Sequence, residues 1–250
     1  MNLLATDLDR TLFHNGKEPY EEGSMEELKE LLKKNNVSVI FVTGRYKELV
    51  KEGIKDYNPP PPSYVIADVG TSIYKYENGE FIRDEDWDEE LKKIWKNHDR
   101  FFIREVLKDF EKLKEQEEIK LNKFKQSYYL EDEEEVELVK EKLEEEGIPA
   151  EVIYSYDTEE RTSLLDIQPK GVSKEGAIRF LIKKIGVDEE KVVYSGDSGN
   201  DLHPLIAFKG ILVGNANSDL KKLLKNKVYQ AKSNYSAGII EGCKYYNLFS

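Results

Sequence analysis

The stretch Asp7-Leu8-Asp9-Arg10-Thr11 follows directly on the short apolar run Leu3-Leu4-Ala5. The apolar run predicts a buried first strand, so the two carboxylates stand where that strand ends. Beyond the strand end, the chain can turn both carboxylates and the threonine hydroxyl toward one small volume. Two anionic groups crowded there repel each other unless a cation or a proton lies between them. The stretch therefore predicts a metal site with a carboxylate to spare for chemistry.

Strands and helices alternate after this start and again near the end of the chain. Apolar runs predict strands at residues 37–42, 64–67, 192–194 and 211–213. Helical spacing predicts helices after Ser24, where Ser24 and Glu27 have the spacing of a capping box, after residue 45 and over residues 177–185. Such alternation is typical of an α/β fold with a Rossmann-like, doubly wound parallel sheet. Ligands of that fold bind at the carboxyl ends of the strands.

The middle of the chain has a different pattern. Two long helices are expected near residues 89–114 and 133–146, with strands at residues 124–130, 151–156 and 163–167. We therefore expect a core domain formed by residues 1–79 and 168–250. Residues 80–167 are expected to form an inserted α+β domain.

Composition limits the classes of partner. The net charge of −12 would repel nucleic acid and anionic membranes, so neither is an expected partner. No run approaches the roughly 20 apolar residues of a membrane span, and the chain starts without a signal-peptide pattern. Cys243 is the only cysteine, so no intrachain disulfide can form and a cytoplasmic location is expected. A monomer or a small homo-oligomer is the expected state.

Further polar residues fall at the other predicted strand ends. Asp197 and Asp201 lie in a glycine-containing turn, and their hard oxygen ligands suit Mg²⁺; the alternative is that Asp201 only caps the next helix. Thr43 precedes a helix, where its hydroxyl and nearby backbone N–H groups could bind a phosphate, unless it belongs to an ordinary turn. Lys174 could neutralise a phosphoryl group or be a solvated surface lysine. Together these groups would supply a nucleophile, an acid/base, a phosphate contact, a cation and a metal, as phosphoryl transfer requires.

In their order along the chain, four segments resemble the motifs of haloacid dehalogenase superfamily phosphatases. They are residues 7–11, residues 43–45, Lys174 and residues 196–201. The inserted domain resembles the α/β cap of the Cof-type branch, and the closest likeness within it is to sucrose-phosphate phosphatases. Two departures from that family are Arg10 with Leu12, where Asn or Gly and an aromatic residue are usual, and Glu175, where Gly is usual.

The resemblance implies specific roles for these residues. Asp7 would be the nucleophile and Asp9 the acid/base, and Mg²⁺ would be held by Asp7, Asp9 and Asp197 with support from Asp201. The implied phosphate contacts are Thr43, Gly44, Lys174 and Asn200, and the expected substrate contacts are Arg45, Gly70, Thr71, Lys125 and Tyr128.

The implied activity is hydrolysis of a sugar phosphate through an aspartyl-phosphate. The expected substrate is a disaccharide phosphate such as sucrose 6-phosphate. The alternatives are a phosphatase for a monosaccharide or amino-sugar phosphate, a phosphomutase of the same fold, and a non-catalytic sugar-phosphate sensor. A sensor could lose Asp7 or Asp9 without penalty, and both are present.

Overall fold

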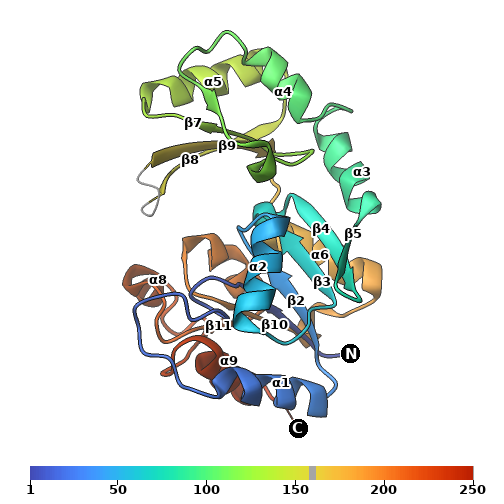
Figure 1. The fold of residues 1–250 in the computed structure, drawn as a ribbon, viewed down its shortest axis with the longest axis vertical. Coiled ribbons are helices and arrows are strands. Elements are labelled where there is room, and N and C mark those ends of the chain that lie inside the picture. The colour runs from blue at the N-terminus through green and yellow to red at the C-terminus, as the bar shows by residue number, and fades with distance from the viewer. Residues whose placement is uncertain (158–161, 250) are drawn as a thin grey trace. The chain divides into compact units, whose positions relative to one another are not determined.

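The computed structural model describes residues 1–157 and 162–249, which form two compact units (Figure 1). The first unit comprises residues 1–83 and 173–250, and the second comprises residues 84–172. The chain therefore leaves the first unit and returns to it once, with the junctions at residues 83/84 and 172/173.

An eight-stranded sheet forms the centre of the first unit, in the order β12-β11-β10-β1-β2-β3-β4-β5. Six of its strands are parallel neighbours: β12 (Tyr229–Gln230), β11 (Lys209–Leu212), β10 (Val192–Gly196), β1 (Leu3–Thr6), β2 (Ser38–Val42) and β3 (Tyr64–Ala67). The strands β4 (Ser72–Glu77) and β5 (Glu80–Arg83) continue the sheet in antiparallel sense. The predicted α/β class and parallel core are confirmed, and the antiparallel edge is an addition to them.

Strand β1 occupies the point where the strand order reverses, between β10 and β2. Since all three strands run in the same direction, their carboxyl ends meet at one edge of the sheet. Residues more than 180 positions apart in the sequence are thus brought together there, as general experience with doubly wound sheets would predict.

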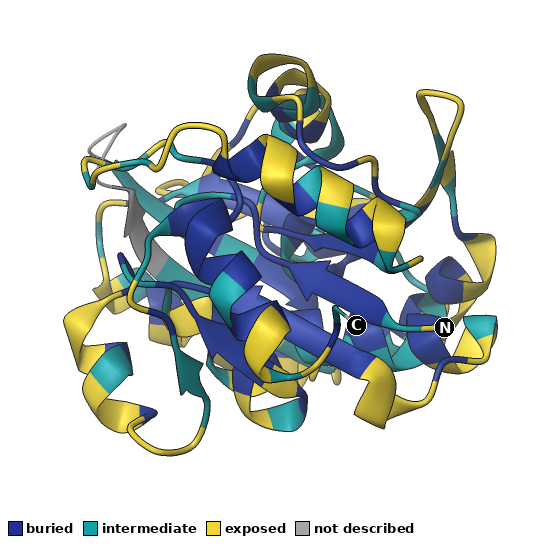
Figure 2. Cartoon of the chain, turned by 90° about the horizontal axis from the view of Figure 1, so that it is seen from below, coloured by how far each residue is buried: buried dark blue, intermediate teal, exposed yellow. Residues whose placement is uncertain are grey.

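Helices cover this sheet and leave its central strands β11, β10, β1, β2 and β3 almost wholly buried, as Figure 2 shows. They are α1 (Ser24–Lys34), α2 (Lys47–Tyr57), α6 (Lys174–Ile185), α7 (Leu202–Ala207), α8 (Ser218–Leu223) and α9 (Tyr235–Tyr245), with short 3₁₀ turns η1 (Asp68–Gly70), η3 (Glu189–Lys191) and η4 (Gly199–Asp201). The capping box expected at Ser24 is wrong. Ser24 is the first residue inside α1, and its hydroxyl hydrogen-bonds the Ser236 hydroxyl at 2.7 Å.

The second unit is an antiparallel sheet with helices. The sheet order is β6 (Lys114–Glu115), β7 (Gln126–Tyr129), β9 (Thr162–Pro169) and β8 (Ala150–Asp157). Its helices are α3 (Glu85–Ile94), α4 (Arg100–Val106) and α5 (Glu134–Glu145), with a 3₁₀ turn η2 (Glu118–Lys120). In the two described segments of the chain, no helix is long and apolar enough to cross a membrane.

The single helix expected over residues 89–114 is wrong, because the chain breaks it into α3 and α4. Lys96 and Asn97 take left-handed backbone conformations with φ of 50° and 69°, which stop a right-handed helix. Asp99 then caps α4 by accepting hydrogen bonds from the backbone N–H groups of Phe101 and Phe102 at 3.0 and 3.4 Å. The expected helix over residues 133–146 is confirmed as α5.

Candidate active site

Asp7 lies at the carboxyl end of β1, immediately after its last residue. Its backbone N–H donates to the Ser195 carbonyl oxygen at 2.9 Å, which continues the β1–β10 pairing by one residue. The residue is only 5% exposed. Lys174 Nζ, which is also buried, donates to Asp7 Oδ1 at 2.7 Å. Lys174, the first residue of α6, thus neutralises the carboxylate of Asp7, the first residue of the loop after β1.

Two more aspartates reach the same volume from the end of β10. Asp201 accepts from the backbone N–H groups of Asp197 and Ser198 at 3.1 and 3.2 Å, and it forms a capping box with Ser198. Its other oxygen accepts from Lys174 Nζ at 2.8 Å and from the Tyr194 hydroxyl at 2.5 Å. Asp201 therefore caps the turn η4 rather than the helix α7, and it also orients the lysine, while its role at a metal ion stays a prediction.

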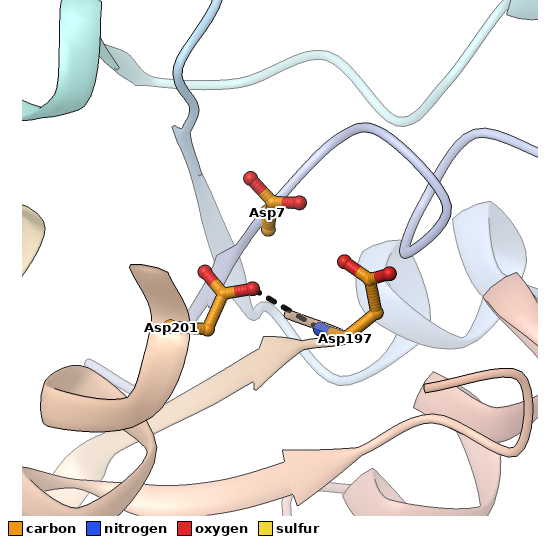
Figure 3. A group of neighbouring side chains, drawn as sticks. All are labelled: Asp7, Asp197 and Asp201. Carbon is orange, nitrogen blue, oxygen red and sulfur yellow. Dashed lines mark hydrogen bonds between the residues drawn. The ribbon is translucent and has the colours of Figure 1, made fainter. Parts of the chain in front are cut away.

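The carboxylates of Asp7, Asp197 and Asp201 form one acidic cluster (Figure 3). One oxygen from each lies within 4.8 Å of the others, and all three residues are buried. Burial, the largest influence, together with the charge of Asp201, raises the pKa of Asp7 well above its usual value, although Lys174 opposes this. Burial and Asp201 likewise raise the pKa of Asp197 to about 6. Negative charge thus exceeds what Lys174 can balance.

The donor set fits a magnesium ion. Three buried carboxylates supply hard oxygen ligands. The raised pKa values of Asp7 and Asp197, which burial causes first and the neighbouring carboxylate of Asp201 second, are consistent with room for a further cation. Lys174 supplies one positive charge, and burial opposes that charge. The attraction of Asp201 and Asp7 outweighs the opposition and raises the lysine pKa. The cluster comes from strand ends that the sequence analysis had placed at one edge of the sheet.

Asp9 has different partners from Asp7. Arg45 donates to its carboxylate from Nη2 at 2.6 Å and from Nε at 2.9 and 3.1 Å, and the Asn15 amide donates at 2.6 Å. The Asp9 side chain is 40% exposed, and that of Arg45 is 17% exposed. Arg45 had been expected to contact substrate. In the structure its guanidinium holds the Asp9 carboxylate, and the expected substrate contact stays a prediction.

Thr43 lies at the end of β2 and is fully buried. Its hydroxyl accepts from the backbone N–H of Arg45 at 3.1 Å, and its carbonyl accepts from the N–H of Val69 at 3.1 Å. Asp68 and Val69 hold left-handed conformations with φ of 51° and 57°. Such strain in a branched residue persists only where the surrounding structure imposes it. Here the hydrogen bond from Val69 to Thr43 holds the turn after β3 against the loop of Thr43 and Gly44.

The remaining predicted residues divide between the two units. In the first, Asn200 accepts from Lys174 Nζ at 3.2 Å, and the Thr71 hydroxyl donates to the Asp68 carbonyl at 3.0 Å. Gly70 packs closely against Ser173, the residue before Lys174. In the second unit, Lys125 pairs with Asp166 at 3.4 Å, and Tyr128 is 4% exposed.

Several residues of this site had no role predicted from the sequence. Tyr194 binds Asp201, and Asn215 and Tyr235 belong to a network around Arg10. Asn215 follows the strand β11, so its position after a predicted strand end was a usable signal. Tyr194 and Tyr235 gave no signal, because a buried tyrosine in a strand or helix is ordinary core composition.

The sheet, the inserted unit and the strand-end carboxylates paired with a buried lysine define a phosphatase of the haloacid dehalogenase superfamily. A model of the family described as sucrose-6F-phosphate phosphohydrolase matches residues 1–247, and the chain belongs to this family. It is a hydrolase of the sugar-phosphatase type.

Individual relatives agree with this family. The chain is 31% identical to sucrose-phosphatase 2 of Nicotiana tabacum over 98% of its own length and 59% of that protein. It is 26% identical to the mannosylfructose-phosphate phosphatase of Agrobacterium fabrum, with 99% and 98% of the two chains covered. The structure of the sucrose-phosphatase from Synechocystis sp. PCC6803, in complex with sucrose and phosphate, superposes with a TM-score of 0.75, 26% identity and 98% coverage of both chains. The chain thus spans about three fifths of the length of the tobacco sucrose-phosphatase.

Proposed function

We propose that this protein is a Mg²⁺-dependent phosphatase that hydrolyses a disaccharide phosphate such as sucrose 6-phosphate through an aspartyl-phosphate. The observation that carries the proposal is the difference between the two carboxylates of the first loop. Asp7 is buried beside Lys174 and the acidic cluster, whereas Asp9 is more exposed and is held by Arg45 and Asn15. This difference supports Asp7 as the nucleophile and Asp9 as the group that exchanges protons with substrate or water.

In the first step, an oxygen of the Asp7 carboxylate attacks phosphorus. The bond between phosphorus and the sugar oxygen breaks, and Asp9 gives its proton to that oxygen. Lys174 donates to Asp7 at 2.7 Å, so its ammonium lies where it can also bind an oxygen of the transferring phosphoryl group. Thr43, Gly44 and Asn200 are proposed to hold the other phosphoryl oxygens.

In the second step, water attacks the phosphorus of the aspartyl-phosphate. Asp9 takes the proton of the water, and the bond between phosphorus and Asp7 breaks. This step releases inorganic phosphate and regenerates both carboxyl groups in their starting forms. We propose that Asp7, the Asp9 carbonyl and Asp197 hold the magnesium ion and that Asp201 supports them; when bound, the ion neutralises charge on the phosphoryl group.

Two relatives support a disaccharide phosphate as the substrate. One was solved with sucrose and phosphate, and the name of the other specifies mannosylfructose phosphate. Both names describe a fructose-containing disaccharide, which favours this class over monosaccharide and amino-sugar phosphates. Gly70, Thr71, Lys125 and Tyr128 remain proposed sugar contacts. The buried position of Tyr128 favours Lys125 for direct contact. We place the enzyme in the cytoplasm, as a monomer or small homo-oligomer.

Phosphate release from a panel of substrates tests the proposal. Sucrose 6-phosphate, mannosylfructose phosphate, glucose 6-phosphate and glucosamine 6-phosphate are each incubated with the purified protein and Mg²⁺. We expect the highest kcat/KM on a disaccharide phosphate and no release by Asp7→Asn. Release of phosphate by the Asp7→Asn variant would refute the role of Asp7. A preference for a monosaccharide phosphate, or an isomerised sugar phosphate in a coupled assay, would refute the substrate or the reaction.

A further inference from the structure

Arg10 occupies an unusual place in the first loop. It lies between Asp9 and Thr11, and its φ of 55° puts it in the left-handed region, which disfavours residues with a long side chain. Asn and Gly, which the family usually has at this position, tolerate that conformation well. An arginine in this unfavourable backbone conformation suggests that its side chain has a specific role.

The Arg10 guanidinium lies on the acidic cluster. Its Nε donates to Asp197 Oδ2 at 3.3 Å, and its Nη2 donates to Glu18 Oε1 at 2.9 Å and to the Asn215 carbonyl at 3.2 Å. The Asp197 side chain is only 6% exposed, while that of Arg10 is 41% exposed. The guanidinium thus reaches from the solvent side onto a carboxylate that is otherwise turned inward.

Other residues hold Arg10 in this position from three segments of the chain. The Asn215 amide donates to the Arg10 carbonyl at 2.5 Å, and Asn215 Oδ1 accepts from the backbone N–H of Tyr235 at 2.9 Å. The Tyr235 hydroxyl donates to Glu18 Oε2 at 3.0 Å. Arg10 is therefore part of a closed hydrogen-bond network, and its contact with Asp197 is more than one pose of a free surface arginine.

Charge decides what this contact does to a divalent ion. The cluster carries three carboxylates, and Lys174 supplies one positive charge. Arg10 supplies a second, directly on Asp197. A metal ion binding through Asp197 would meet both the repulsion of the guanidinium and a carboxylate oxygen that already accepts a hydrogen bond.

We propose that Arg10 is a built-in cation that competes with the divalent metal for Asp197 and sets the metal affinity of this site. Glu18 opposes it, because its carboxylate draws the same guanidinium away from Asp197. The proposal rests on the proposed use of Mg²⁺ by this cluster. It concerns the affinity for the ion and is independent of which sugar phosphate is hydrolysed.

Calorimetric titration of the metal-free full chain with MgCl₂, without substrate, tests this competition. Arg10→Met removes the charge, and we expect it to bind Mg²⁺ about fivefold more tightly, or about 1 kcal/mol, as for a partly exposed ion pair. Arg10→Asn is the second variant, since asparagine suits the left-handed backbone, and it should tighten binding similarly. Glu18→Gln should weaken binding about two- to threefold.

The double variant of Arg10→Met and Glu18→Gln shows whether Glu18 acts through Arg10. We expect the effect of Glu18→Gln to shrink by more than half in this background. Unchanged or weaker Mg²⁺ binding in both Arg10 variants, with native circular dichroism, would overturn the proposal. Asp197→Asn is the control for the site itself. If that variant binds Mg²⁺ as the wild type does, the proposed metal site fails, which is a different outcome from failure of the Arg10 competition.

Discussion

Replacing Arg45 by methionine should impair the protonation of the leaving group more than any other part of the reaction. Within the described part of the chain, Arg45 supplies three of the four hydrogen bonds to the Asp9 carboxylate, at 2.6, 2.9 and 3.1 Å. Asn15 supplies the fourth, at 2.6 Å. The arginine is itself fixed, since its Nη1 donates to the Leu49 carbonyl at 3.0 Å and its guanidinium lies over the Phe13 ring. The carboxylate direction therefore depends mainly on Arg45.

The size of the effect follows from what remains in the variant. A positioned general acid contributes roughly 10²- to 10⁴-fold to a rate. The Arg45→Met variant keeps Asp9 and its contact with Asn15, so part of this contribution survives. We expect kcat on the sugar phosphate to fall about 10- to 100-fold, with a smaller change in KM.

Two substrates with different leaving groups separate this role from phosphate binding. A sugar alkoxide needs a proton to leave, whereas 4-nitrophenolate leaves readily without one. Arg45→Met should therefore lose less than about threefold on 4-nitrophenyl phosphate, a loss too small for a missing phosphate contact. Arg179→Met is a matched control, because Arg179 pairs with Glu175 and Glu189 on the surface of α6. Equal losses on both substrates would refute the positioning role and support the direct substrate contact expected from the sequence.

Three further predictions concern the free energy of unfolding of the protein and its dependence on pH in the absence of metal. Lys174→Met leaves Asp201 buried without its ammonium partner and should lower the free energy of unfolding by about 3–5 kcal/mol in denaturant titrations. Gly70→Ala should cost at least about 2 kcal/mol, because φ is 104° and an added Cβ would lie 2.5 Å from the Ser173 carbonyl oxygen. The raised pKa of Asp197 means that the folded state holds its proton more tightly, so the contribution of this residue to stability in EDTA should fall as pH rises from about 4 to 7. Asp197→Asn should remove on the order of 3 kcal/mol of that fall, and an identical pH profile would contradict the assignment.

The sequence predicted the location of site residues best where the direction of the parallel strands alone determines it. Asp7, Thr43 and Asp197 follow three predicted strands, and parallel strands place their carboxyl ends at one edge. The acidic cluster could be expected before any side chain was placed. Lys174 was harder to assign, because a lysine at the start of a helix is usually solvated, and only the packing of α6 makes it 1% exposed.

Local sequence pattern gave wrong predictions where tertiary contacts or the backbone angles of single residues determine the structure. Ser24 has the spacing of a capping box, yet its hydroxyl binds Ser236 on α9, which no local pattern contains. The helical periodicity after residue 89 continues through Lys96 and Asn97, although their left-handed conformations end the helix. The contact of Arg45 with Asp9 could not be predicted from the sequence either, because a long side chain beside a phosphate site can bind the substrate or the acid/base equally well.

Asp201 shows why structural and functional interpretations of one residue need not compete. Its Oδ2 accepts the backbone N–H groups of the turn, and its Oδ1 accepts from Lys174 and Tyr194. Both oxygens are thus engaged by several protein donors. Among the described residues, the Asp197 carboxylate accepts one side-chain hydrogen bond from the half-exposed Arg10 and one from the buried Thr11. A cation entering the cluster would displace fewer hydrogen bonds from Asp197 than from Asp201. We therefore expect Asp201 to support the site through its capping role, and Asp197 to be the carboxylate for which Arg10 and a metal ion compete.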